Sequence, residues 1–213
     1  MTDKLALDVA YALQSPEDNR RLYAEWAESY DQDFADDMGY VLPIFVADVF
    51  VQCPGRTHSG RILDVGAGTG LVGKRLAYHS VHSVDGLDIS AEMLAVAFAK
   101  GYYKKTIECN LLERLPIVSA KYDGIISAGT FTHGHVGPAA LDELLRIAKP
   151  GALFCLSINL EHFETAGFKK KLKEIDNDID NLSLQTVPIY MQGSVGRHAS
   201  DLGVIVLFRK TLP

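Results

Sequence analysis

The residue types best suited to bind a nucleotide occur together in residues 62–70, whose sequence is ILDVGAGTG. An apolar run carrying one carboxylate, Asp64, leads directly into glycines at alternate positions, Gly66, Gly68 and Gly70. Glycine adopts positive φ angles, and because it has no Cβ it lets a ligand approach main-chain N–H groups. This pattern predicts the first strand and the cofactor loop of a nucleotide-binding α/β sheet.

Two kinds of nucleotide cofactor are compatible with this loop. Residues 68–73 satisfy the pattern GxGxxG, and Asp88 follows at about the distance of the ribose-binding acid of a dinucleotide site. However, Asp64 would face and repel a pyrophosphate, and the chain has room for only one such half-sheet. A ligand with a cation and no phosphate, such as S-adenosylmethionine, would instead be attracted by Asp64. The residues therefore favour S-adenosylmethionine and leave a nicotinamide cofactor as the alternative.

A second group of reactive side chains follows the fourth expected strand. His133 and His135 lie two residues apart there, and imidazole titrates near neutral pH, so either could act as a general base. Their alternative role is to hydrogen-bond their neighbours. Tyr30 and His162 are further candidates for the base. Two histidines alone do not make a metal site, so no bound metal is expected.

The segments around these residues alternate between strand and helix patterns. Such alternation predicts parallel strands joined by right-handed crossovers, with the ligand at the carboxyl ends of the strands. Strands are expected from residue 62 and at 81–87, 105–109, 122–128 and 152–158, and helices at 71–78, 91–100 and 138–148.

Helical patterns also precede this alternating region. Residues 5–30 are predicted to be helical, with Ser15 and Pro16 as a cap and first-turn signal. Trp26 and Tyr30 lie four residues apart on one face of this helical region. Their rings either seal the edge of the core or form a lid over the mouth of the site.

The segments that flank the alternating region complete the expected architecture. A further helix is predicted at 40–52. Near the carboxyl terminus, apolar residues at 168, 172, 175 and 179 fall on one face of an expected amphipathic helix. Two last strands, at 185–191 and 203–209, are expected to join the sheet edge as a hairpin-like pair.

Composition excludes several classes of protein. The chain has 213 residues, of which 47% are hydrophobic, and this suits one ordinary α/β domain. A formal net charge of −6 and a pI near 5.6 provide no net attraction for nucleic acid. No apolar run is long enough to cross a membrane, and the first residues do not open a signal peptide, so a cytoplasmic location is expected. The three cysteines form no CxxC pair and predict neither disulfides nor zinc.

Four motifs follow one another between residues 61 and 158. They are LDVGAGTG at 63–70, GLDISAEML at 86–94, YDGII at 122–126 and LRIAKPG at 145–151. In order and spacing they resemble the successive motifs of class I S-adenosylmethionine-dependent methyltransferases. The segments WAESYD at 26–31 and GTFTHGH at 129–135 further resemble the Williams–Beuren region methyltransferase-like proteins.

The resemblance implies a fold and a division of the chain. The expected fold is α/β, a Rossmann-like seven-stranded, mostly parallel sheet with helices on both faces, an antiparallel C-terminal strand and an N-terminal helical lid. The whole of 1–213 would form one methyltransferase domain. Within it, 1–57 would be the lid, 58–160 the cofactor-binding core, and 161–213 the C-terminal helix and the last two strands.

The resemblance also implies how the glycine loop holds S-adenosylmethionine. Asp64 would anchor the methionine ammonium, directly or through water. The backbone at Gly66, Ala67, Gly68 and Gly70 would pass close under the cofactor.

Further cofactor contacts are implied at the ends of the next strands. Asp88 would accept both ribose hydroxyls. Asn110 occupies the place where the family commonly has an aspartate, and its carbonyl could accept a bond from the adenine amino group. Ser127 or Ala128 would border the sulfonium. The remaining implied contacts are Ile89 and Met93, of which Ile89 would pack on adenine, the main-chain N–H of Leu111, and Trp26 and Tyr30 from the lid.

The methyl acceptor is constrained mainly by motifs that the chain lacks. The segments Asn-Pro-Pro-Tyr and Asp-Pro-Pro-Tyr, which mark amino methylation of nucleic-acid bases in this superfamily, do not occur at 127–130, and no Pro-Cys nucleophile is present. A small-molecule acceptor methylated at O, S, N or C is therefore expected, with S-adenosylhomocysteine as the product. The alternatives are a cofactor-binding regulatory protein without catalysis and a nicotinamide-dependent oxidoreductase.

Overall fold

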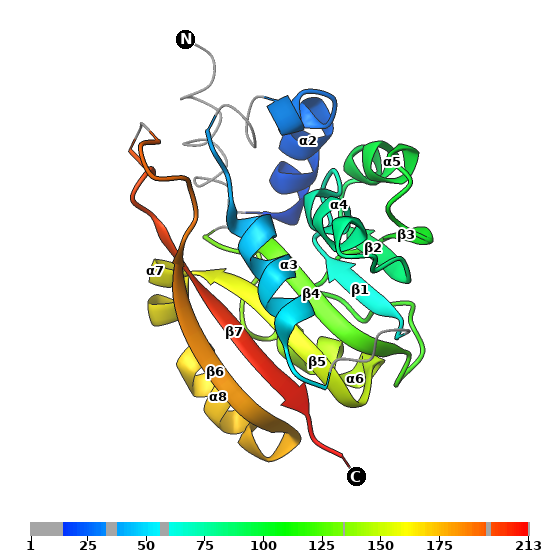
Figure 1. The fold of residues 1–213 in the computed structure, drawn as a ribbon, viewed down its shortest axis with the longest axis vertical. Coiled ribbons are helices and arrows are strands. Elements are labelled where there is room, and N and C mark those ends of the chain that lie inside the picture. Colours follow the sequence, from blue (N-terminus) through cyan, green and yellow to red (C-terminus); the bar gives the residue numbers. More distant parts are fainter. Residues whose placement is uncertain (1–14, 33–37, 56–59, 134, 195–196, 213) are drawn as a thin grey trace.

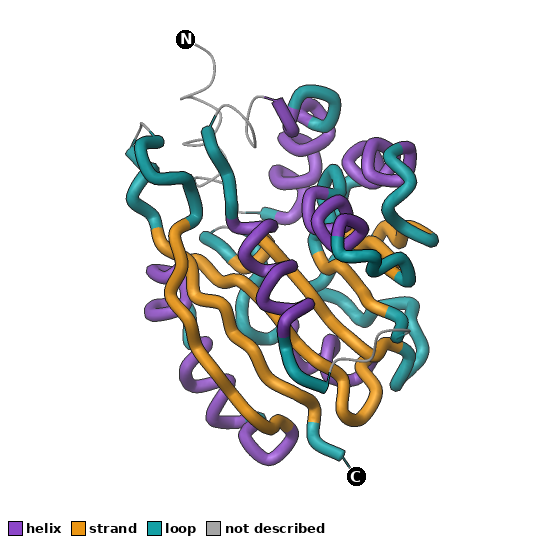
Figure 2. Tube along the Cα trace, viewed as in Figure 1, coloured by secondary structure: helices purple, strands orange, loops and turns teal. Residues whose placement is uncertain are grey.

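A computed structural model describes residues 15–32, 38–55, 60–133, 135–194 and 197–212, and shows a seven-stranded sheet with helices around it (Figures 1 and 2). The strand order is β3-β2-β1-β4-β5-β7-β6. The strands are β1 (Ile62–Val65), β2 (Val84–Asp88), β3 (Lys105–Glu108), β4 (Tyr122–Phe131), β5 (Ala148–Asn159), β6 (Ile179–Pro188) and β7 (Leu202–Lys210). The helices are α2 (Pro16–Trp26), α3 (Leu42–Gln52), α4 (Leu71–Tyr78), α5 (Ala91–Ala99), α6 (Ala140–Ile147), α7 (Leu160–Thr165) and α8 (Phe168–Glu174).

The strand directions confirm the expected mostly parallel sheet with an antiparallel C-terminal strand. Strands β1 to β5 pair in parallel, and β7 pairs antiparallel with both β5 and β6. From β1 the chain moves outward to β3 and then returns to place β4 on the other side of β1. This reversal opens a crevice at the carboxyl ends of β1 and β4, where ligands bind in open α/β sheets.

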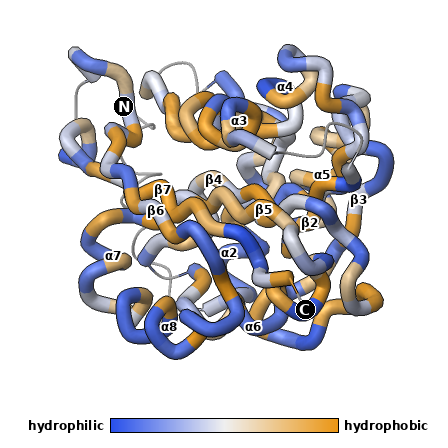
Figure 3. The backbone as a smooth tube through the Cα atoms, turned by 60° about the horizontal axis from the view of Figure 1, so that its bottom comes forward, coloured by the Kyte–Doolittle hydropathy of each residue, from blue (hydrophilic) through white to orange (hydrophobic). Residues whose placement is uncertain are grey.

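The sheet is buried on both faces because its strands alternate side chains between two hydrophobic clusters. Leu63 and Val65 of β1 face the cluster under α6 and α8, whereas Ile62 faces the cluster under α3 and α4. Figure 3 shows these two helix layers on opposite sides of the sheet. The expectation of helices on both faces is therefore confirmed.

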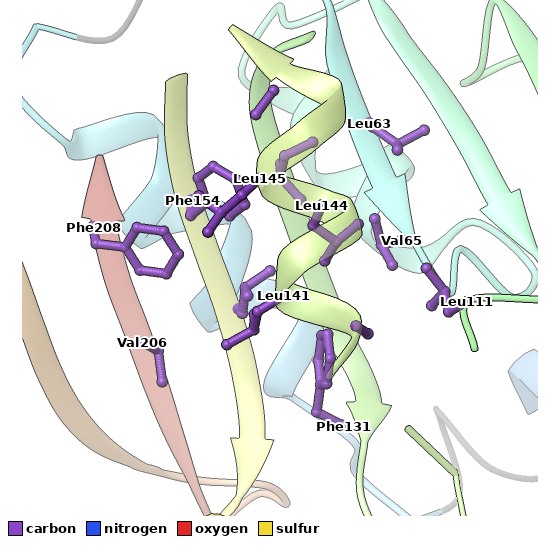
Figure 4. Close-up of a cluster of buried hydrophobic side chains, with 14 of the residues drawn as sticks. Leu63, Val65, Leu111, Phe131, Leu141, Leu144, Leu145, Phe154, Val206 and Phe208 are labelled. Carbon is purple, nitrogen blue, oxygen red and sulfur yellow. The ribbon is translucent and has the colours of Figure 1, made fainter. Parts of the chain in front are cut away.

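Helix α6 illustrates how the first of these clusters is held together. Its leucines Leu141, Leu144 and Leu145 recur at helical spacing and are all buried. Figure 4 shows them lying over β1, β4 and β5, close to Val65 and Phe154. Truncating one such leucine to alanine costs about 2–5 kcal/mol in comparable cores.

The segment after β5 differs from its prediction. Instead of one helix over 168–179, the chain forms α7, α8 and a short 3₁₀ turn, Asp176–Asp178, and Ile179 begins β6. Gly167, with φ +92°, separates α7 from α8. Ile179 is thus buried as the first residue of a strand. Its helical spacing from Phe168 therefore does not reflect a shared helix. Strand β6 consequently begins six residues before the predicted 185.

The N-terminal part is described from residue 15, so the helix expected over 5–14 lies outside the described residues. Helix α2 begins as predicted, because the Ser15 hydroxyl oxygen accepts a bond from the Asp18 N–H at 3.2 Å and Pro16 occupies the first turn. Helix α3 confirms most of the helix expected over 40–52, with Pro43 in its first turn. Among the described residues, no helix combines the length and apolar character needed to cross a bilayer.

Candidate active site

A large cavity lies at the carboxyl ends of β1, β2, β4 and β5, under helix α2. Its empty space, counted together with the open solvent at its mouth, is about 1280 Å³. Eleven of the residues predicted to form the site lie on its wall: Trp26, Tyr30, Gly66, Gly68, Asp88, Ile89, Met93, Asn110, Leu111, Ala128 and His135.

The glycine loop forms the floor of this cavity. Gly66, Gly68 and Gly70 all have positive φ angles, of +68°, +51° and +94°. A Cβ on Gly66 would stand 1.8 Å from Thr130 Oγ1, whereas one on Gly68 would meet no atom within 4 Å. Gly66 is therefore required by packing between β1 and β4, and Gly68 presents open backbone to the cavity.

Two other residues of this loop were predicted to contact the cofactor and lie elsewhere. Ala67 is buried in the cluster under α3 and α4, and its N–H donates to Leu87 O at 2.9 Å. Gly70 is the N-cap of α4, and the Tyr103 ring lies 3.3 Å from the position of its Cβ. Neither residue is part of the cavity wall as the structure describes it.

Asp88, at the end of β2, is the carboxylate on the cavity wall. Its Oδ2 accepts from the Gly68 N–H at 2.8 Å, and its Oδ1 accepts from the Ser90 N–H at 3.0 Å. Burial raises the pKa of Asp88, and hydrogen bonds from the backbone of Ser90, Gly68 and Ile89 oppose the rise. Each oxygen keeps a second lone pair, so the side chain is oriented and still able to accept two further hydrogen bonds.

Asp64 lies behind the glycine loop and is not on the cavity wall. Its side chain is fully buried, and Tyr103 Oη donates to its Oδ2 at 2.5 Å. Its Oδ1 has no hydrogen-bond partner. Burial raises the pKa of Asp64 to about 7, although the bond from Tyr103 lowers it. A buried carboxylate oxygen without a partner is costly, so Oδ1 of Asp64 is able to accept a hydrogen bond.

The wall beyond Asp88 is formed mainly by Ile89, Met93, Asn110 and Leu111. Asn110 Oδ1 already accepts from the Leu112 N–H at 3.0 Å, and the amide donates to Glu113 Oε1 at 3.2 Å. The carbonyl of Asn110 retains one lone pair for a ligand.

Ser127, which was predicted to border the sulfonium, links two strands of the sheet. Its hydroxyl donates to Val65 O at 2.7 Å, and the residue is fully buried and off the cavity wall. Ala128, the next residue of β4, lines the cavity instead. The β pleat explains this difference, since successive side chains point to opposite faces.

The structure separates the two candidate histidines. His135 lies on the cavity wall, whereas His133 packs its ring 5.2 Å from the ring of His162 and does not reach the wall. The His133 carbonyl lies 3.0 Å from His135 Nδ1, and because a carbonyl only accepts, Nδ1 must carry the proton. His135 Nε2 is then the lone-pair nitrogen, and Tyr23 Oη, at 3.2 Å, donates to it.

Electrostatics at His135 favour the neutral ring. Burial lowers the pKa of His135 below its ordinary value, and the bond to the His133 carbonyl only partly opposes this. At neutral pH the imidazole is therefore uncharged and able to accept a proton.

Several residues of the cavity wall were not predicted from the sequence. Tyr23 could have been found, because it lies one helical turn before Trp26, and Asn159 could have been found as a polar residue at the end of a strand. Tyr40 and Tyr190 are far apart in sequence and meet through an isolated β-bridge and a ring contact, so no local pattern identifies them. Other unpredicted polar side chains on the wall are Asn19, Thr130, Thr132 and Ser157.

The segment after α2 is attached directly to the glycine loop. The Thr69 hydroxyl donates to Asp31, and Lys100 Nζ contacts Asp31 Oδ2 at 2.5 Å and Thr69 O at 2.7 Å. Tyr30, next to Asp31, is thereby held over the cavity. Within the described part of the chain, no group of three or more His, Cys, Asp or Glu residues could hold a metal ion.

Fold and cavity together define a nucleotide-binding α/β domain whose ligand site lies at the topological switch point. Residues 62–151 match a family described as a methyltransferase domain. Human methyltransferase-like protein 27 is 38% identical over 149 residues, which are 67% of this chain and 60% of the human protein. The chain thus aligns with less than two thirds of the length of each of the curated relatives it matches.

Solved structures show the same fold. A methyltransferase from Aquifex aeolicus superposes with a TM-score of 0.60 at 18% identity, covering 87% of this chain and 97% of that one. The [4+2]-cyclase SpnF superposes with a TM-score of 0.68 at 15% identity, covering 94% and 98%. The family match and the human relative support a class I S-adenosylmethionine-dependent methyltransferase, and this family implies S-adenosylmethionine as the cofactor.

The residues of this chain fit that cofactor. Gly68 presents backbone to open space, Asp88 has two lone pairs available on the cavity wall, and Asp64 Oδ1 is a buried acceptor without a partner. These features match a ligand that carries hydroxyls and a cation and that approaches main chain closely.

Proposed function

We propose that this chain transfers the methyl group of S-adenosylmethionine to a small-molecule acceptor, with His135 accepting the proton that the acceptor loses. The observation that carries the proposal is one cavity whose wall includes Gly68 and Asp88, from the ends of β1 and β2, together with His135, which follows β4. A donor bound beside Gly68 and Asp88 and an acceptor bound beside His135 would meet near Ala128 and Thr130.

The cofactor end is proposed to work through hydrogen bonds and apolar contact. Asp88 would accept from the ribose hydroxyls, Ile89 and Met93 would pack on adenine, and Asn110 would accept from its amino group. Asp64 Oδ1 would receive the methionine ammonium through a water, because Asp64 lies behind the loop and off the wall.

Catalysis then requires positioning, exclusion of water and removal of one proton. S-adenosylmethionine supplies a methyl carbon that its sulfonium already activates for in-line displacement. Neutral His135 would take the acceptor's proton at Nε2, the nitrogen left unprotonated by the bond from Nδ1 to the His133 carbonyl. Tyr23 donates to the same nitrogen and would either yield this position to the acceptor or relay its proton. Trp26 and Tyr30 cover the cavity and would exclude water.

The experiment is a methyl-transfer screen of the full chain against a metabolite library, with S-adenosylhomocysteine as the readout and calorimetry for cofactor binding. We expect S-adenosylmethionine to bind and one or more small molecules to be methylated. Binding of S-adenosylmethionine with no turnover of any acceptor would support a regulatory protein instead. Tight binding of NAD(H) with none of S-adenosylmethionine would overturn the assignment.

A further inference from the structure

We divide the cavity wall into two halves according to the elements that supply its residues. The half next to Gly68, Asp88 and Asn110 is the proposed cofactor position. The other half, which we call the acceptor half, lies beyond the carboxyl ends of β4 and β5. Its described side chains include Tyr23, Tyr40, Thr132, His135, Asn159 and Tyr190.

The described residues of the acceptor half include no cationic side chain that would pair with an anion. Among the described residues that line the whole cavity, none is a lysine or an arginine, and Asp88, in the cofactor half, is the sole carboxylate. Burial lowers the pKa of His135 and raises that of Tyr30, so both side chains are uncharged at neutral pH. A carboxylate or phosphate placed there would lose its hydration without gaining a cationic partner, which is strongly unfavourable.

Aromatic rings form two walls of this half. On one side, the rings of Tyr23, Trp26 and Tyr30 have centroids 5.9–6.3 Å apart. On the other, Tyr40 and Tyr190 are 6.0 Å apart and joined by a backbone bridge. Such surfaces favour offset or edge-to-face contact with a flat aromatic ligand.

Tyr40 is also held in place by the end of β4. Gly129 has a φ angle of +82°, and a Cβ added to it would stand 2.5 Å from Tyr40 Oη. The tyrosine hydroxyl therefore rests against the backbone of the strand, and this wall is preformed.

Polar groups with unused hydrogen-bonding capacity lie beside these rings. Thr132 Oγ1 is buried without a partner. Asn159, 8% exposed, accepts from the His162 N–H through Oδ1, and its amide nitrogen donates to no described residue. Buried polar groups of this kind are normally satisfied, so a ligand with its own donor and acceptor would complete them.

We infer that the acceptor is a planar aromatic compound that carries no carboxylate or phosphate and whose nucleophile is a hydroxyl or an amine. This inference rests on the proposed function. The acceptor oxygen or nitrogen forms a bond to the methyl carbon while the carbon–sulfur bond breaks and leaves its electron pair on sulfur. His135 Nε2 takes the acceptor's proton, so charge and atoms balance.

Binding can be measured without turnover because Trp26, the single tryptophan of the chain, lines the cavity and its fluorescence reports occupancy. The protein saturated with S-adenosylhomocysteine is titrated with two matched pairs of probes. One pair is 4-methylcatechol and 3,4-dihydroxybenzoate, and the other is 4-methylaniline and 4-aminobenzoate. We expect the uncharged member of at least one pair to bind at least tenfold more tightly than its carboxylate. Equal or tighter binding of both carboxylates, or no binding of any probe, would overturn the inference.

A variant that adds a positive charge to the acceptor half provides an independent test. Thr132→Lys places an ammonium in the acceptor half. We expect this variant to bind 3,4-dihydroxybenzoate about tenfold more tightly than 4-methylcatechol, the reverse of the wild-type preference. Thr186→Lys, the same change at an exposed position of β6, is the matched control and should leave the preference as in the wild type. If Thr132→Lys does not fold, Tyr190→Leu is used, which should weaken binding of 4-methylcatechol about tenfold. An unchanged preference or affinity in a folded variant contradicts the inference.

The two proposals fail in different ways. If S-adenosylhomocysteine does not bind, the proposed function fails. If it binds and methyl transfer to carboxylated acceptors predominates, the proposed function stands and only the acceptor class is wrong.

Discussion

Tyr103 Oη donates a 2.5 Å hydrogen bond to Asp64 Oδ2 in the fully buried space behind the glycine loop. The same tyrosine ring packs so closely on α4 that a Cβ on Gly73 would stand 2.7 Å from it. Gly73, which completes the GxGxxG pattern, is therefore needed for contact with Tyr103 and not for contact with a phosphate. The hydrogen bond from Tyr103 lowers the pKa of Asp64, whereas burial raises it, and Oδ1 of Asp64 has no hydrogen-bond partner.

The first prediction concerns Asp64 and pH. Its pKa is about 7 in the folded protein and about 3.8 in the unfolded chain. Between these values the unfolded state binds fewer protons, so the free energy of unfolding falls as pH rises from 4 to 7. We expect Asp64→Asn to remove this fall and to raise the free energy of unfolding of the ligand-free protein at pH 8 by about 2–4 kcal/mol.

Urea unfolding of wild type and Asp64→Asn at pH 5 and pH 8 measures this effect. The same variant is expected to bind S-adenosylmethionine more weakly, because the unpartnered oxygen would no longer be anionic. A variant that is less stable at pH 8, or that binds the cofactor as tightly as the wild type, would contradict the role proposed for Asp64.

The second prediction concerns the ribose contact of Asp88. Asp88→Ala removes two proposed hydrogen bonds to a charged group and should weaken S-adenosylmethionine binding by about 1.5–3 kcal/mol, measured by calorimetry. Asp123→Ala is the matched control, since Asp123 contacts the Arg61 N–H and Lys149 at the other end of the sheet. Unchanged affinity in Asp88→Ala would rule out the ribose contact.

The third prediction separates the two histidines of the loop after β4. His135→Gln should slow methyl transfer by about 100-fold with little change in cofactor affinity, because a general base contributes roughly that much. His133→Gln should retain most activity, since only its main-chain carbonyl contacts His135. Comparable losses in both variants would show that the loop acts structurally.

The pH profile adds a readout for the base itself. Because the pKa of His135 is lowered by burial, the rate should fall only below pH 6.5, where the ring gains a proton. Tyr23→Phe removes the hydroxyl that donates to neutral Nε2 and should move this acidic limb upward. An acidic limb that does not move would show that Tyr23 does not act on His135.

The fourth prediction uses two glycines to separate binding from folding. Gly68 and Gly101 both have positive φ angles, +51° and +76°, and an added Cβ meets nothing within 4 Å at either position. Alanine at either site should therefore destabilise the protein by a similar amount, about 1–2 kcal/mol. Only Gly68→Ala should also weaken cofactor binding, by tenfold or more, since only Gly68 faces the cavity. Equal affinities in the two variants would place the cofactor away from Gly68.

Local sequence patterns correctly predicted the elements that depend only on residues close together in the chain. The glycine loop after β1, the Ser15 and Pro16 start of α2 and the end of β2 at Asp88 were all predicted, because each depends on φ preference, capping or burial within a few residues. The helix expected over 168–179 failed because residues with helical spacing were divided between α8 and a strand. Periodicity cannot tell these apart when the segment is short.

The sequence alone predicted the fold class, the sheet and the cofactor, since these depend on the ordered motifs between residues 61 and 158. It did not determine which of His133 and His135 reaches the cavity, or that Asp64 and Ser127 face away from it. Those outcomes depend on the direction of each side chain about its own backbone and on partners distant in sequence: Tyr103 for Asp64, Val65 for Ser127 and Tyr23 for His135. Only the packed tertiary structure brings such partners together, because no local interaction specifies contacts between residues so far apart in the chain.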